Sequence, residues 1–254
     1  MQETRINKFL SESGVCSRRE ADRAVEEGRV KINGTVAFMG QKVSEDDTVE
    51  FDGKLVKNQE RPVLLAVNKP VGIVCTTSRR EGTNIVDFLN YPVRVYPIGR
   101  LDKESEGLLL LTNQGELVNK ILRGSYTHEK EYLVRVDKPL TDEFLKRMRE
   151  GVPILDTVTK PCTVEQTGRQ SFRIILTQGL NRQIRRMCQA LGYRVRFLKR
   201  VRIMNIRLGD LKTGAYREVA GEERRILLES LKGVSGLPFR EEESELPDGS
   251  ARAF

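Results

Sequence analysis

The chain begins with hydrophobic residues at helical spacing. Ile6, Phe9 and Leu10 would lie on one face of a helix. The Ser-Arg-Arg-Glu sequence at residues 17–20 has the form of a capping box, in which the serine and glutamate side chains satisfy free N–H groups of the first turn. A second helix should therefore begin there, and Gly28 is expected to mark its end.

Strand-like segments follow these two predicted helices. Residues 29–32 alternate between basic and apolar positions, and Asn33–Gly34 is a preferred two-residue turn of a β-hairpin. Residues 49–51 predict another strand, which the turn at Asp52–Gly53 ends. These signals predict a compact module of two helices and a small sheet over residues 5–56.

A larger domain is expected after this module. Residues 57–61 form a polar stretch before Pro62 and are predicted to be a linker, and residues 63–67 form a continuous apolar run typical of a buried strand. Strand and helix patterns then alternate, which predicts a mixed sheet domain. The predicted strands are residues 73–75, 132–136 and 172–176, and the predicted helices are residues 141–150 and 182–191.

The predicted fold class is α+β. A chain of 254 residues is long enough for two domains that each bury a core. The predicted boundaries are residues 1–57 for the module, 62–232 for the larger domain and 233–254 for a tail. Acidic residues are frequent between positions 241 and 248, so the tail has the composition of a disordered segment.

Charge narrows the class of partner. Lysine and arginine outnumber aspartate and glutamate 44 to 36, which gives a net charge of +8 and favours a polyanion such as nucleic acid, although a solvated basic surface has the same composition. In the N-terminal module the cations gather around the two helices, where they could meet phosphates or simply keep the helices soluble. These residues are Arg5, Lys8, Arg18, Arg19, Arg23, Arg29 and Lys31.

A second basic segment lies near the end of the larger domain. Nine lysines and arginines, and no acid, lie between Asn181 and Leu208. Alternation at residues 194–197 and 200–203 would place several cations on one face of a strand while apolar residues point inward. We therefore expect a phosphate-binding surface here, because no acidic residue of the segment compensates these cations.

The residue types and their spacing argue against a metal site, disulfide bonds and a membrane-spanning helix. The cysteines Cys16, Cys75, Cys162 and Cys188 lie far apart without a zinc-type pair, so free thiols are expected. The single histidine, His128, is expected to be structural and disfavours a Ser-His-Asp triad. The N-terminus lacks a signal-peptide pattern, and no apolar stretch approaches the roughly 20 residues of a membrane helix. A cytoplasmic protein without membrane contact is therefore expected.

One carboxylate has an unusual sequence context. Residues 99–107 place Asp102 between Arg100 and a glycine-ended turn. In a cleft, a nearby guanidinium would keep this carboxylate ionised, as a nucleophile or base requires, but Asp102 could also merely cap a turn before a buried strand. Tyr132, near the start of a predicted strand, could stack on an extruded base or fill the core. These residues alone favour the structural alternatives.

Taken together, the ordered motifs resemble the ribosomal small-subunit type family of pseudouridine synthases. The resemblance covers about residues 5–230, and the first module resembles the alpha-L RNA-binding domain of a small-subunit ribosomal protein. Residues 67–74, 84–88 and 179–183 look most like a subfamily that acts on large-subunit ribosomal RNA. The family motifs are Arg100–Asp102, Ser105–Thr112, Lys130–Tyr132 and Asn181–Met187.

The resemblance implies a fold, an activity and site residues. It implies an alpha-L domain followed by a mixed, mainly antiparallel catalytic sheet, which isomerises a uridine of 23S ribosomal RNA without a cofactor or metal. Asp102 would be the catalytic aspartate, Arg185 its basic partner and Tyr132 a contact to the target base. Arg100 and Ile184 would flank the site. The remaining expected RNA-binding residues are Arg182, Arg186, Arg5, Lys8, Arg18 and Arg19.

Some alternatives remain open. The same chemistry could act on a transfer RNA, since both RNA classes present looped uridines. A non-catalytic RNA-binding or ribosome-assembly protein would also keep the basic module. Leu180 stands where many relatives have a basic residue, and the tail is acidic where some relatives have a basic extension. We expect the protein to act as a monomer.

Overall fold

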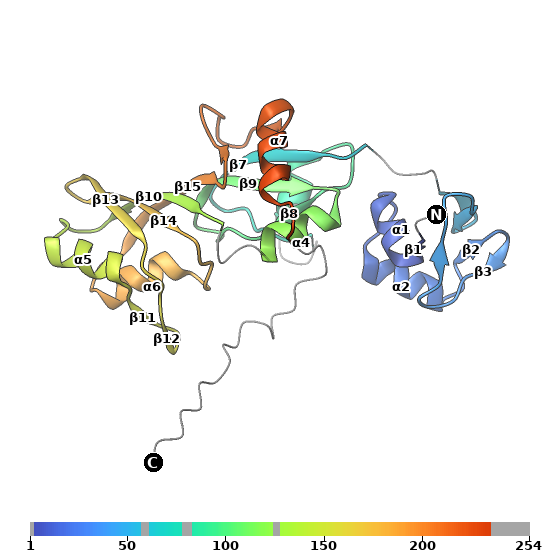
Figure 1. Ribbon diagram of the computed structural model, residues 1–254, viewed down its shortest axis with the longest axis horizontal. Coiled ribbons are helices and arrows are strands. Elements are labelled where there is room, and N and C mark those ends of the chain that lie inside the picture. Colours follow the sequence, from blue (N-terminus) through green and yellow to red (C-terminus); the bar gives the residue numbers. More distant parts are fainter. Residues whose placement is uncertain (1–2, 57–60, 78–82, 124–127, 235–254) are drawn as a thin grey trace, which may run out of the picture. The chain divides into compact units, whose positions relative to one another are not determined.

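The computed structural model describes residues 3–56, 61–77, 83–123 and 128–234 (Figure 1). Most of the predicted linker and most of the predicted acidic tail lie outside these residues. The chain divides into two compact units. Unit 1 comprises Met1–Gly115 and Leu208–Ala220, and unit 2 comprises Glu116–Arg207 and Gly221–Phe254. No helix in the described part of the chain is long and apolar enough to cross a membrane.

Unit 1 begins with the two predicted helices, α1 (Ile6–Glu12) and α2 (Arg18–Glu26). The predicted capping box is confirmed, because the Glu20 N–H donates to Ser17 Oγ at 3.2 Å and the Ser17 N–H donates to the Glu20 carboxylate at 3.4 Å. Gly28, with φ +71°, follows the end of α2 as predicted.

The strands of this N-terminal module are short and antiparallel. The turns predicted at Asn33–Gly34 and Asp52–Gly53 are confirmed, since all four residues have positive φ. Apolar side chains of both helices pack with those of the sheet in one core. A four-stranded sheet has the order β3 (Thr35–Val36), β2 (Val30–Ile32), β5 (Val49–Phe51), β6 (Lys54–Leu55), and β1 (Thr4–Arg5) pairs with β4 (Lys42–Val43).

The rest of unit 1 is built on a buried antiparallel ladder. In order, β8 (Tyr96–Ile98), β9 (Glu106–Thr112), β7 (Leu64–Lys69) and β17 (Tyr216–Glu218) are neighbours. Every residue of β7 is buried, which explains its continuous apolar run. Helix α3 spans Ile85–Leu89. The prediction of a strand at residues 73–75 is wrong. This segment is a loop, in which an isolated bridge joins Val74 to Asn84.

Unit 2 holds an antiparallel sheet with the order β13 (Thr163–Gly168), β14 (Ser171–Leu176), β10 (Lys130–Val136), β15 (Val195–Ile203). The strands and helices predicted at residues 132–136, 172–176, 141–150 and 182–191 are confirmed within a few residues. The other elements are α4 (Gly115–Arg123), α5 (Asp142–Glu150), α6 (Gln183–Ala190), α7 (Gly221–Ser230), β11 (Pro153–Ile154), β12 (Thr157–Val158) and β16 (Ile206–Arg207).

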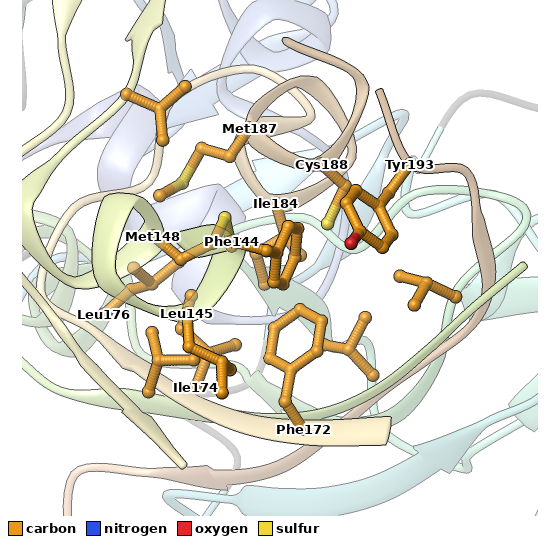
Figure 2. Close-up of a cluster of buried hydrophobic side chains, with 14 of the residues drawn as sticks. Phe144, Leu145, Met148, Phe172, Ile174, Leu176, Ile184, Met187, Cys188 and Tyr193 are labelled. Atoms are coloured by element: carbon orange, nitrogen blue, oxygen red, sulfur yellow. The ribbon is translucent and has the colours of Figure 1, made fainter. Parts of the chain in front are cut away.

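Helices α5 and α6 bury their apolar faces against one face of this sheet (Figure 2). Phe172 of β14 is completely buried, and the Phe144 ring meets it edge-on at 5.6 Å between centroids. Met187 and Cys188 of α6 are also fully buried in this cluster. Truncating a buried methionine to alanine in such a core costs about 2–5 kcal/mol, so packing fixes the position of α6 on the sheet.

The prediction that β15 carries its cations on one face is wrong for Arg200 and Arg202. Tyr132 pairs with Arg200 but Glu131 pairs with Arg202, so the ladder has an irregularity at Val201. This extra residue puts Arg200 and Arg202 on opposite faces of the sheet. Acids also compensate part of the segment: Arg202 donates to the carboxylates of Glu131 at 2.8 Å and Glu129 at 2.9 Å.

Glu131 is a buried acid between two arginines. It is 8% exposed, and Arg173 donates to it from the neighbouring strand at 3.2 Å. Burial alone would raise the pKa of Glu131, but the hydrogen bonds from Arg202 and Arg173 lower it below its ordinary value. The ionised carboxylate therefore stabilises the pairing of β10 with both of its neighbours.

Glu131→Gln should lower the free energy of unfolding by about 3 kcal/mol at pH 7, because two arginines lose a buried anionic partner. Since the folded-state pKa is depressed, this stabilisation is present above the ordinary glutamate pKa and is lost as the pH falls through the folded-state value. Urea unfolding at pH 7 and at pH 4 measures both effects. Glu165→Gln, an exposed partner of Arg173, should cost less than about 1 kcal/mol; equal losses would contradict this account.

Candidate active site

Asp102 lies in a turn immediately before the buried strand β9. Its carbonyl oxygen accepts the Ser105 N–H at 3.0 Å, and the residue is half-buried. Leu101 before it is buried and Arg100 is exposed. Gly107, with φ +106°, then begins the fully buried part of β9. The turn therefore places one carboxylate where the chain enters the core of unit 1.

The loop at residues 70–75 packs against this turn. The Gly72 N–H donates to the Lys103 carbonyl at 2.8 Å. Lys69, at the end of β7, is fully buried, and its ammonium donates to the carbonyls of Pro70 at 2.8 Å and Ile73 at 2.9 Å. A buried ammonium is tolerated only with such partners, so Lys69 fixes the shape of this loop.

Tyr132 stands on the core side of β10 in unit 2, together with two cations. The Arg200 guanidinium lies 6.0 Å from the centre of the tyrosine ring, and Arg200 is 5% exposed. Lys130 donates to the Thr177 carbonyl at 3.2 Å, and burial together with the charge of Arg200 lowers its pKa to about 8. The surroundings of Tyr132 are therefore strongly cationic and largely shielded from water.

Helix α6 carries four of the predicted site residues. Arg182 caps its N-terminus with φ +51° and is exposed, and Arg186 donates to the backbone and side-chain oxygens of Asn181 at 3.0 and 3.2 Å. Arg185 is half-buried. Ile184 is 5% exposed within the core cluster of Figure 2, which leaves little of its side chain for RNA, so we expect it to hold α6 in place.

The N-terminal module presents the other predicted RNA-binding cations. Arg5 and Arg19 are exposed, whereas Lys8 and Arg18 are half-buried. Lys8 lies 3.7 Å from Glu12 one turn along α1. Arg5, Lys8, Arg18 and Arg19 therefore keep at least part of each side chain at the surface of this module.

The structure thus gathers the predicted residues in three places. Unit 1 holds two of these groups: the basic residues of the N-terminal module, and Arg100 with Asp102. Unit 2 holds the third, which consists of Tyr132 and the residues of α6. The pairing of Asp102 with Arg185 stays a prediction. In the described residues, no group of three or more His, Cys, Asp or Glu side chains is arranged to hold a metal ion.

Three residues beside these positions were not predicted as site residues. Lys69 could have been found from its position at the end of an apolar strand, because a lysine is almost never fully buried unless its charge is paired. Cys75 and Arg200 give no such signal. Cys75 looks like any small apolar residue, and Arg200 is buried only because of the irregularity at Val201.

Comparison with known proteins identifies the class. The family model described as RNA pseudouridylate synthase matches residues 63–190, and the S4 domain model matches residues 4–49. A crystal structure of a pseudouridylate synthase superposes with a TM-score of 0.64 at 30% identity, covering 88% of this chain and 99% of that one. The chain belongs to the RNA pseudouridylate synthase family and is an RNA-modifying isomerase. The predicted α+β fold is confirmed.

Several relatives share one name. Dual-specificity RNA pseudouridine synthase RluF from Salmonella typhi is 55% identical over 234 residues, covering 91% of this chain and 81% of the relative. The protein of that name from Escherichia coli K12 is 56% identical, covering 86% and 76%. Ribosomal large subunit pseudouridine synthase B from Bacillus subtilis is 37% identical, covering 86% and 93%. The high identity to the relatives named RluF over most of the chain confirms the predicted resemblance to one subfamily of these enzymes.

Arg185→Ala should slow isomerisation about 10- to 100-fold under single-turnover conditions while RNA affinity changes little, because the expected role of Arg185 is to keep a carboxylate charged and oriented. Rates at saturating enzyme and filter-binding affinities measure the two quantities. Arg147→Ala, which removes an exposed cation from α5, is the matched control. A wild-type rate in Arg185→Ala would remove this role.

Proposed function

We propose that this enzyme isomerises a specific uridine of 23S ribosomal RNA to pseudouridine, with Asp102 as the reactive carboxylate. The observation that carries the proposal is the place of Asp102: a half-buried carboxylate in a tightly bonded turn, within the family motif, in a chain that is 55–57% identical to relatives named RluF. The name of the Bacillus subtilis relative, which refers to the large ribosomal subunit, supports this choice of RNA.

The reaction needs one reactive carboxylate and a rotated base. The bond between ribose C1′ and N1 breaks, the base turns, and C5 bonds to C1′; the C5 proton leaves and N1 gains a proton. An ionised Asp102 could attack C1′, attack C6 of the base, or remove the 2′ proton to give a glycal. Arg185 would hold the carboxylate ionised in each of these routes.

The base must leave its stack before it can react. Extruding a nucleotide costs a few kcal/mol, which contacts to the flanking phosphates can offset. We expect Arg182, Arg186 and Arg100 to make such contacts, because each is at least partly exposed and is close in the chain to a predicted catalytic residue. Tyr132 would then stack on the base or assist removal of the C5 proton.

A second RNA substrate is the other candidate function. The relatives' name states dual specificity for RNA, which favours a second substrate in addition to ribosomal RNA. We propose a transfer RNA, since this class of RNA also presents looped uridines. We expect the enzyme to act as a monomer in the cytoplasm.

Asp102→Asn should abolish pseudouridine formation while RNA affinity stays nearly unchanged, because the amide keeps the size of the side chain and loses its charge. Release of tritium from C5 of labelled uridine measures the reaction on 23S ribosomal RNA transcribed in vitro, and on transfer RNA transcripts in parallel. Retained activity would overturn the catalytic role of Asp102 and leave open a different reactive group. Chemical mapping of RNA from cells that lack this protein would identify the modified position.

Replacing Arg18 and Arg19 together by alanine should weaken RNA binding and reduce the slope of log affinity against log salt by about one for each phosphate that the variant no longer neutralises. The matched control removes the same net charge from Arg225 and Lys232, which are already paired with Glu222 and Glu229. Equal slopes in the two double variants would show that the module's arginines make no specific phosphate contacts.

A further inference from the structure

The thiol of Cys75 contacts both backbone polar groups of the residue before Asp102. Cys75 Sγ donates to the Leu101 carbonyl oxygen at 3.2 Å and accepts the Leu101 N–H at 3.4 Å. Both residues are buried, with exposures of 6% and 7%. One side chain from the loop at residues 70–75 therefore forms a two-point bridge to the segment that carries Asp102.

This bridge meets a need of the local backbone. Leu101 lies outside any strand or helix, so no regular ladder provides partners for its N–H and carbonyl groups. Buried backbone groups are nearly always paired, and leaving one unpaired costs more than a typical hydrogen bond contributes. A thiol is a weak donor and a weak acceptor, and at Cys75 it acts in both capacities toward one residue.

The other side of Asp102 is also attached to the same loop. The Gly72 N–H donates to the Lys103 carbonyl at 2.8 Å, and the Asp102 carbonyl accepts the Ser105 N–H at 3.0 Å. Three consecutive backbone carbonyls, at residues 101, 102 and 103, are thus held by three different partners. The backbone of Asp102 has little freedom to shift or to rotate while these bonds are intact.

We propose that Cys75 is a positioning residue for the isomerisation: its thiol fixes the backbone of Leu101 and thereby the direction in which the Asp102 carboxylate points. The proposal rests on the catalytic role of Asp102 proposed above. Cys75 itself takes no part in bond making, because it acts through Leu101 and is buried. The consequence is kinetic, since a displacement of about 1 Å at a reacting group can cost about 100-fold in rate.

The test compares substitutions that remove or keep the hydrogen-bonding capacity of position 75. Cys75→Ala removes both bonds, Cys75→Val removes them while keeping the apolar volume, and Cys75→Ser keeps a donor and an acceptor on a slightly shorter side chain. Cys162→Ala is the matched control, because that thiol also donates to a backbone carbonyl, of Met148 at 3.1 Å, but lies in unit 2. Single-turnover rate, RNA affinity and melting temperature are measured for each full-length variant.

We expect Cys75→Ala and Cys75→Val to lower the single-turnover rate about 10- to 100-fold with RNA affinity unchanged. Cys75→Ser should recover most of that rate, and Cys162→Ala should keep the wild-type rate even where its melting temperature falls as far. If Cys75→Ala does not fold, the comparison of Cys75→Val with Cys75→Ser decides. A wild-type rate without the thiol, a parallel loss of affinity, or a folded Cys75→Ser as slow as Cys75→Val overturns the proposal.

Asp102→Asn, assayed alongside, separates this proposal from the one on which it rests. Full activity in Asp102→Asn overturns the catalytic role of Asp102 and the positioning role of Cys75 with it. Loss of activity in Asp102→Asn together with an unchanged rate in Cys75→Ala and Cys75→Val overturns the positioning role alone.

Discussion

The buried ladder between β7 and β9 is the constraint on which the candidate site of unit 1 depends. Both strands lie in the core, so the chain enters and leaves them through irregular segments whose backbone groups are shielded from water. Such groups need partners, and the loop after β7 and the turn before β9 supply them to each other. Asp102 is held firmly because it lies in one of these segments, so its position follows from the hydrogen-bonding needs of the backbone.

In unit 2 the pairing of backbone groups also decides where site residues lie, through an irregularity in the ladder between β10 and β15. The irregularity at Val201 turns Arg200 toward the core side of β10, next to Tyr132, and turns Arg202 toward the acids on the other side. Irregularities of this kind often re-aim a side chain beside an active site. Arg202 therefore takes part in the ion pairs that stabilise the sheet, whereas Arg200 lies beside the candidate base-binding tyrosine.

Local sequence signals predicted most helices, strands and turns correctly. Features that depend on contacts between distant residues were not predicted. The capping box at Ser17, the turn at Asn33–Gly34 and the helix before Ala190 all depend on neighbouring residues, so the sequence is enough to find them. The loop at residues 73–75 has apolar residues like those of a strand, but Ile73 bonds to the side chain of Lys69, and Cys75 bonds to Leu101, which is 26 residues away in the sequence. The burial of Arg200 depends on one extra residue of its own strand, Val201, and only the pairing of β15 with β10 reveals this residue.

The alternation of side chains along β10 has a consequence for how this enzyme can change. Glu131 and Tyr132 are adjacent in the chain, but they face opposite sides of the sheet: one joins an ionic network and the other adjoins the hydrophobic core. Glu131 stabilises the sheet from one side through its ion pairs, and Tyr132, the proposed contact to the nucleobase, lies on the other side. A single strand of seven residues thus carries a stabilising ionic network on one side and the proposed base contact on the other.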